Sequence, residues 1–193
     1  MQRDRPKIHF ATSNVNKFLE AQSILAEYGV QLVQVGHKGV EIQSGSVEEV
    51  ARESARSAAS KAGVATLVED AGLFVNALRG FPGAYSSFVH ATLGCDGVLK
   101  LLNGISDRKA RFVSAVAFCE PEGQPKCFPG VVEGTIAREA RGKSGFGFDP
   151  IFLADGAGDR TFGEMQTNEK NKYSHRAKAF REFVRWFVGT IKP

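Results

Sequence analysis

The apolar positions in the N-terminal third of the chain switch between the two-residue period of strands and the 3.6-residue period of helices. Apolar residues recur at roughly helical spacing from Val15 to Tyr28, and Gly29 ends this predicted helix. A second predicted helix, at residues 47–62, carries a stripe of valine and alanine that can lie close against a sheet. Strands are predicted at residues 7–11, 31–35 and 64–69. This β-α-β-α-β order predicts an α/β fold.

The pattern is less regular in the centre of the chain. The elements expected there are a strand at 73–78, short helices at 85–93 and 97–102, and a hairpin of strands at 110–119 and 127–136. Pro129 predicts that the second hairpin strand lies at a sheet edge or carries a bulge. Apolar residues at helical spacing over 177–188 predict an amphipathic C-terminal helix, and Ser174 is well placed to cap its start.

Composition narrows the class of protein. The 193 residues suffice for one large domain or two lobes that share a core, and 42% hydrophobic with 24% charged residues is typical of a soluble globular protein. The net charge of +4 suits a phosphate-bearing small molecule and is weak for a dedicated nucleic-acid-binding domain. Apolar runs stay far below the roughly 18 residues of a membrane span, and no secretory signal is visible. Three cysteines without CxxC spacing favour a reducing, cytoplasmic compartment.

The first candidate for chemistry is TSNVNK at residues 12–17, where a strand is followed by a helix. Free backbone N–H groups and the helix dipole attract anions at such a junction. Ser13 and Asn14 add polar side chains, and Lys17 adds a charge one turn later. The same residues also suit an ordinary helix cap, because serine and asparagine are favoured capping residues. The local sequence leaves both interpretations open.

Two acidic positions form the second candidate. Asp70 follows Glu69 at the expected end of a parallel strand, which is where ligands gather in open α/β sheets. Glu41 stands in the polar loop GVEIQSG after the second strand. Two carboxylates near a triphosphate can hold Mg²⁺, and one of them can take a proton from water. Acids at strand ends are also often simply solvated, so the local pattern alone favours neither interpretation.

The third candidate spans residues 145–176, which opens with GFGFDPIF and closes with EKNKYSHR. The segment lacks the period of a helix core or a strand face. Phe146 and Phe148 fit either a core or a platform on which a base stacks, and stacking tolerates every base. Asp149 and the polar side chains of residues 174–176 supply hydrogen-bond donors and acceptors. The segment therefore predicts a pocket for a flat, phosphorylated, hydrogen-bonding molecule such as a nucleotide.

Together these segments resemble the Ham1/RdgB family of inosine triphosphate pyrophosphatases, which hydrolyse non-standard purine triphosphates. The matching motifs are TSNVNK, VEIQSG, VEDAGL, GFPGAYS, GFGFDPIF, TFGEM and EKNKYSHR, and they stand in the family's order over nearly the whole chain. The resemblance implies an α/β fold with a mixed central sheet flanked by helices. It also implies a single domain over residues 1–193, with two lobes and the nucleotide cleft between them, and a homodimer.

The resemblance also implies roles for individual residues. The triphosphate-binding set is Thr12, Ser13, Asn14 and Lys17. The metal-binding acids are Glu41 and Asp70, which would hold Mg²⁺, and the catalytic residues are Asp70 and Lys17. The base- and sugar-recognition set is Phe146, Phe148, Asp149, Lys170, Ser174, His175 and Arg176. Phe146 matches the stacking aromatic, whereas Phe148 stands where many relatives carry tryptophan.

One departure from the family lies on the second helix, where some relatives carry a lysine that reaches the phosphates. The matching position here is near Ser54, so either Arg52, Arg56 or Lys61 substitutes for that lysine or no residue does. The expected reaction is hydrolysis of ITP, dITP or XTP to the nucleoside monophosphate and pyrophosphate. The alternatives are a Maf-like pyrophosphatase for other modified nucleotides, a nucleotide sensor without turnover, and a binder of single-stranded nucleic acid.

Overall fold

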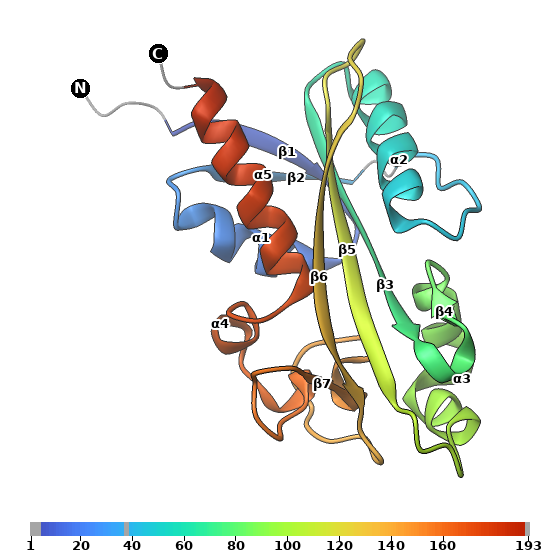
Figure 1. Ribbon diagram of the computed structural model, residues 1–193. Coiled ribbons are helices and arrows are strands. Elements are labelled where there is room, and N and C mark those ends of the chain that lie inside the picture. The colour runs from blue at the N-terminus through green and yellow to red at the C-terminus, as the bar shows by residue number, and fades with distance from the viewer. Residues whose placement is uncertain (1–4, 37–38, 192–193) are drawn as a thin grey trace.

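The computed structural model describes residues 5–36 and 39–191 as a mixed seven-stranded sheet with helices on both faces (Figure 1). The strand order is β2-β1-β3-β5-β6-β7, with β4 added to β3. The elements are β1 Lys7–Ala11, α1 Val15–Ala26, β2 Gln31–Val35, α2 Val47–Ala62, β3 Thr66–Val75, η1 Asn76–Leu78, β4 Pro82–Gly83, α3 Ser86–Leu101, β5 Lys109–Cys119, β6 Lys126–Ile136, η2 Asp149–Ile151, β7 Phe152–Ala154, η3 Phe162–Glu164, α4 Thr167–Lys170 and α5 His175–Ile191.

The parallel part of the sheet confirms the predicted β-α-β-α-β order. β1 pairs in parallel with β2 and with the start of β3, where His9 lies opposite Thr66. Alternating side chains of β3 and β5 point to opposite faces, as the pleat requires. Leu67 and Val116 pack with α1 and α5, whereas Val68 and Ala117 pack with α2. The alanine-rich stripe of α2 therefore lies against the sheet, as its sequence predicts.

The strands predicted at 64–69 and 73–78 belong to one continuous strand that ends at Val75, and residues 76–78 form the 3-10 helix η1 instead, which corrects the sequence interpretation. β3 runs from Thr66 to Val75, and β5 pairs with it antiparallel along its full length. β1 ends at Ala11, so the second half of β3 has no β1 residues beside it. Pairing with β5 keeps this half of β3 extended. Glu69 and Asp70 therefore lie in the middle of a strand rather than at its end.

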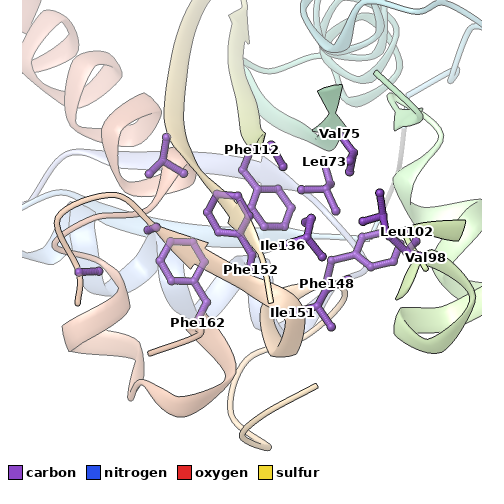
Figure 2. Close-up of a cluster of buried hydrophobic side chains, with 14 of the residues drawn as sticks. Leu73, Val75, Val98, Leu102, Phe112, Ile136, Phe148, Ile151, Phe152 and Phe162 are labelled. Carbon is purple, nitrogen blue, oxygen red and sulfur yellow. The ribbon is translucent and has the colours of Figure 1, made fainter. Parts of the chain in front are cut away.

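A second hydrophobic core lies at the other end of the long strands, around β7 and α3 (Figure 2). Leu73, Phe112 and Ile136 from β3, β5 and β6 enter this core, so the same strands pass through both halves of the molecule. α3 contains a break at Gly94, whose φ of 63° is left-handed, and this break separates the two short helices that the sequence predicts.

The remaining sequence predictions for β6 and α5 are confirmed. Among the described residues, β7 pairs with β6 only at residues 134–136, so Pro129 lies on a stretch of β6 whose outer edge carries no strand. The Ser174 hydroxyl accepts a hydrogen bond from the Ala177 amide and caps α5. In the part of the chain that the structure describes, no helix combines the length and apolar character of a membrane span.

Candidate active site

A cleft of about 960 Å³ lies between the two halves of the molecule. Its walls come from the β1–α1 junction, the loop before α2, the middle of β3, the start of α3, the 146–149 turn and the start of α5. Segments far apart in the sequence meet here because β1 ends at Ala11 whereas β3 and β5 continue past it. The open space beside β3 exposes the carboxyl end of β1, where parallel sheets bind ligands.

The β1–α1 junction forms one end of the cleft. The Asn14 side chain caps α1 by accepting hydrogen bonds from the backbone N–H groups of Asn16 and Lys17 at 3.0 and 3.2 Å. The capping interpretation of this segment is therefore confirmed. Thr12, Asn14 and Lys17 also line the cleft, which leaves the anion-binding interpretation compatible with the cap, whereas Ser13 is exposed and lies outside the lining.

The Lys17 ammonium group is held by Glu69. The Lys17 Nζ lies 2.8 Å from Glu69 Oε2 and donates a hydrogen bond to the Glu69 backbone oxygen at 3.1 Å. Burial by itself raises the pKa of the Glu69 carboxyl, but the charges of Arg176 and Lys17 outweigh this effect and lower that pKa to about 2. Glu69 is therefore ionised in the folded protein at any ordinary pH.

Asp70 and Glu41 both line the cleft beside this pair. Burial raises the pKa of the Asp70 carboxyl to about 6 against the opposing charge of Lys17, and the negative charges of Glu69 and Glu41 add to the rise. Within residues 5–36 and 39–191, no three His, Cys, Asp or Glu side chains gather into a closed metal site. Two carboxylates with room for water and phosphate oxygens match the way proteins hold Mg²⁺.

A buried guanidinium, that of Arg176, contacts the other oxygen of the Glu69 carboxylate. The Arg176 Nε donates to Glu69 Oε1 at 3.1 Å, and its Nη1 donates to Glu20 Oε2 at 2.7 Å. The Arg176 side chain is only 3% exposed, and its Cζ lies 5.1 Å from the centroid of the Phe146 ring. Two carboxylates and an aromatic face thus fix the plane of this guanidinium, and Arg176 lines the cleft.

Lys170 supports this arrangement from behind. Its Nζ bridges Glu20 Oε1 at 2.7 Å and Asp149 Oδ2 at 2.6 Å, and it lies 5.0 Å from the Phe146 ring centroid. The same Asp149 oxygen accepts the Phe146 amide at 2.8 Å. No residue with a side chain fits at position 145, because a Cβ on Gly145 would lie 2.1 Å from Asp149 Oδ2. Lys170 lies outside the cleft lining, so the network positions Phe146 and Arg176.

The other residues of the predicted base-recognition set have different surroundings. Phe148 is 2% exposed and belongs to the core beside Val98 and Leu102 (Figure 2), although it also borders the cleft. His175 borders the cleft with its ring stacked on Phe112 at 4.4 Å. Burial, and then the charge of Arg176, lower the pKa of His175 well below its ordinary value, so this imidazole is neutral. Ser174 is the helix cap already described.

Sequence reasoning assigned no role to three supporting residues, Glu20, Glu69 and Ser114. Glu20 is 4% exposed and lies four positions before Ile24, on the buried face of α1. An acid on the apolar face of a helix is a signal of a buried ion pair, because an unpaired buried charge is costly. Ser114 donates to Glu69 Oε1 at 2.6 Å from the neighbouring strand, and its sequence offers no comparable signal.

On α2, a small residue lies at the position where some relatives carry a phosphate-reaching lysine. Ser54 is buried and lines the cleft. The basic neighbours point elsewhere: Arg52 donates to the Pro125 backbone oxygen at 3.0 Å, and Arg56 pairs with Glu53. Lys61 is exposed near the C-terminal end of α2 and does not line the cleft. None of the three substitutes for a phosphate-reaching lysine.

Together the fold and the cleft define an α/β protein with a charged site between the carboxyl end of β1 and the middle of β3. The chain belongs to the Ham1 family, whose model matches residues 8–186. It is 48% identical over 185 residues, 96% of this chain and 98% of the relative, to a protein of Methanopyrus kandleri named dITP/XTP pyrophosphatase. A protein of the same name from Thermococcus kodakarensis is 46% identical over 96% of this chain and all of the relative.

Solved structures agree with this membership. The structure of a HAM1 protein from Coxiella burnetii matches with a TM-score of 0.84 at 33% identity, over 95% of this chain and 99% of that one. The structure of the Staphylococcus aureus Ham1 protein matches with a TM-score of 0.81 at 28% identity, over 95% and 99% of the two chains. The predicted family and the predicted mixed α/β fold are both confirmed.

Proposed function

We propose that the protein hydrolyses non-canonical purine nucleoside triphosphates, namely ITP, dITP and XTP, to the monophosphate and pyrophosphate, and so cleanses the nucleotide pool. The observation that carries the proposal is that two chemically different groups of side chains line one cleft. Arg176, held over Phe146, belongs to the group that we call the base end, and Lys17, Glu41 and Asp70 form the group that we call the phosphate end. The names of relatives up to 48% identical over nearly the full chain support the same reaction.

The base end supports recognition of a 6-oxo purine. The hydrogen bonds of Arg176 to the described residues use Nε and Nη1, so Nη2 can donate to the O6 acceptor of hypoxanthine or xanthine. Adenine presents an amino group there and would leave the buried donor unpaired. Sites of this kind reject the wrong base by a factor on the order of 10⁴. Guanine shares O6, so its exclusion must depend on the 2-amino group.

The phosphate end supports a magnesium-dependent reaction. Burial and the crowding of negative charge at Asp70 favour a cation between Asp70 and Glu41, because such a cation would offset the rise in the pKa of Asp70. When bound, Mg²⁺ would supply charge neutralisation of the triphosphate. Lys17 and the α1 N-terminus would bind the departing pyrophosphate.

Asp70 is the carboxylate proposed to orient and deprotonate the attacking water. Its pKa of about 6 in the metal-free protein leaves it largely ionised at neutral pH, and Mg²⁺ held beside it would lower that pKa further. Water positioned by Asp70 would attack at the α–β phosphoanhydride, and the proton of that water would pass to the carboxylate. Positioning and electrostatics, rather than a covalent intermediate, would carry the rate.

A pyrophosphate-release assay tests the proposal. The panel contains ITP, dITP, XTP, ATP and GTP, each with and without Mg²⁺. We expect release from the first three nucleotides only with the metal, and absence of turnover with tight nucleotide binding would instead indicate a sensor. Arg176→Ala should lose ITP turnover far more than pyrophosphate affinity. ITP and XTP rates that survive this change would contradict the proposed role of Arg176.

We further propose a single domain of two lobes, a homodimer and a cytoplasmic location. Continuous passage of β3, β5 and β6 through both cores supports one cooperative domain, which would unfold in a single calorimetric transition. The unpaired state of Cys95, Cys119 and Cys127 suits a reducing compartment. Light scattering coupled to gel filtration would measure the mass in solution, and twice 20.9 kDa is the value expected for the dimer.

A further inference from the structure

One carboxylate, that of Glu69, lies between the two ends of the cleft. Its Oε2 is 2.8 Å from Lys17 Nζ at the phosphate end, and its Oε1 accepts Arg176 Nε at 3.1 Å at the base end. The Glu69 side chain is fully buried and Arg176 is nearly so, whereas Lys17 is 19% exposed, so solvent screens the contact with Arg176 least. Both cations therefore depend on the position of the same side chain.

The backbone around Glu69 is fixed, whereas its two partners come from separate helices. Glu69 lies in the middle of β3 and pairs with Val116 of β5. Lys17 lies in the first turn of α1, and Arg176 lies in the first turn of α5. A shift of the Glu69 carboxylate would move both side chains, because each is held by an oxygen of the same rigid group.

Ser114 fixes the orientation of this carboxylate. Its hydroxyl donates to Glu69 Oε1 at 2.6 Å and is completely buried on β5. Ser114 is not among the residues that line the cleft in the described part of the chain, whereas Glu69 is. A change at Ser114 can therefore reach a ligand only through other residues, and Glu69 is the side chain that it contacts.

We infer that Glu69, oriented by Ser114, is a positioning residue that couples the phosphate end of the cleft to the base end. The inference rests on the proposed function and adds a specific route to it. When phosphate oxygens approach Lys17, they share its positive charge with Glu69, and more of the Glu69 charge is then available to hold Arg176. Recognition of the base and of the phosphates would then be cooperative, with the same coupling factor in either direction.

Ser114→Ala tests the coupling without altering a group that meets the ligand. Calorimetric titration in EDTA would measure the affinities for ITP, ATP and pyrophosphate without any need for turnover. We expect ITP affinity to fall about tenfold and pyrophosphate affinity about threefold, with ATP affinity changed less than ITP affinity. Loss at both ends from one hydroxyl outside the cleft is the expected signature.

Thr66→Val is the matched control. Thr66 is also fully buried, lies on the same strand as Glu69 and donates its hydroxyl to the Val64 backbone oxygen at 2.9 Å. The control should lower the melting temperature without changing any of the three affinities. The coupling is wrong if Ser114→Ala behaves like this control, or if it changes the affinity for ITP or pyrophosphate alone.

A second variant separates charge from orientation. Glu69→Gln keeps the shape and removes the negative charge that competes with phosphate for Lys17 and that holds Arg176. The ITP-to-ATP affinity ratio should therefore fall more than in Ser114→Ala, whereas the pyrophosphate affinity should rise. Unchanged affinities in a folded Glu69→Gln protein would overturn the inference. The proposed function is tested separately by pyrophosphate release from ITP in the unaltered protein, so either conclusion can fail while the other stands.

Discussion

The two ends of the cleft are built in opposite ways. At the proposed base end, Lys170 and Arg176 are 2% and 3% exposed and are held by three buried carboxylates. At the proposed phosphate end, Lys17 is 19% exposed, Glu41 is exposed, and Asp70 carries a raised pKa. A rigid, desolvated end suits discrimination between bases, whereas a wetter end leaves room for a metal ion, water and product release.

The largest effect on activity should come from Asp70→Asn. Amide nitrogen and oxygen cannot take a proton from water at neutral pH, so pyrophosphate release from ITP should fall by a factor on the order of 10³. Because burial disfavours the ionised carboxylate, the metal-free variant should also be more stable at pH 7, by about 1–2 kcal/mol. Thermal melts in EDTA would show this gain, and a loss of stability would contradict the assigned electrostatics.

Lys170→Met and Lys17→Met compare the two ends directly. Lys170→Met leaves Asp149 buried without its cation, so unfolding free energy should fall by about 3–5 kcal/mol. Lys17→Met leaves Glu69 paired with Arg176 and should cost about 1–2 kcal/mol while it lowers turnover more strongly. Urea unfolding measures both changes. Equal destabilisation by the two variants would show that the ends do not differ as described.

Acid should weaken the fold through Glu69. Its pKa is about 2 in the folded protein against an ordinary value of 4.5, so the folded state binds fewer protons than the unfolded state. The resulting stabilisation, at most about 3 kcal/mol, is complete above about pH 4.5 and is lost as the pH falls toward 2. Urea midpoints between pH 2 and 6 should fall less steeply in Glu69→Gln. Parallel profiles would assign the acid sensitivity to other carboxylates.

Phe146→Leu should give the smallest effect. Stacking contributes about 1–3 kcal/mol and tolerates every base, so affinities for ITP and ATP should both fall by about five- to tenfold with their ratio unchanged. Competition titrations would measure the ratio. A selective loss of ITP affinity would show that Phe146 acts mainly by orienting Arg176, whose guanidinium lies over the Phe146 ring.

Several features of the site could be predicted from local sequence. Serine and asparagine after a strand indicated the α1 cap, and the Asn14 cap is present. The alternation of glycine and phenylalanine at 145–148 indicated tight turns, and Gly145 and Gly147 both have positive φ. The local sequence predicts two separate strands, at 64–69 and 73–78, where the structure has one. Only pairing with β5 shows that the strand continues.

The sequence by itself determined the family and the α/β order of the first 70 residues, and most of the site residues that it predicted do line the cleft. Short-range periodicity, caps and ordered motifs are properties of the local chain. The tertiary structure alone decided which of the site residues touch. It placed Lys170 behind Phe146, buried Phe148 in the core and joined Glu20, Glu69, Lys170 and Arg176 into one network. Buried ion pairs form between residues up to 156 positions apart, and only packing brings such charges within reach.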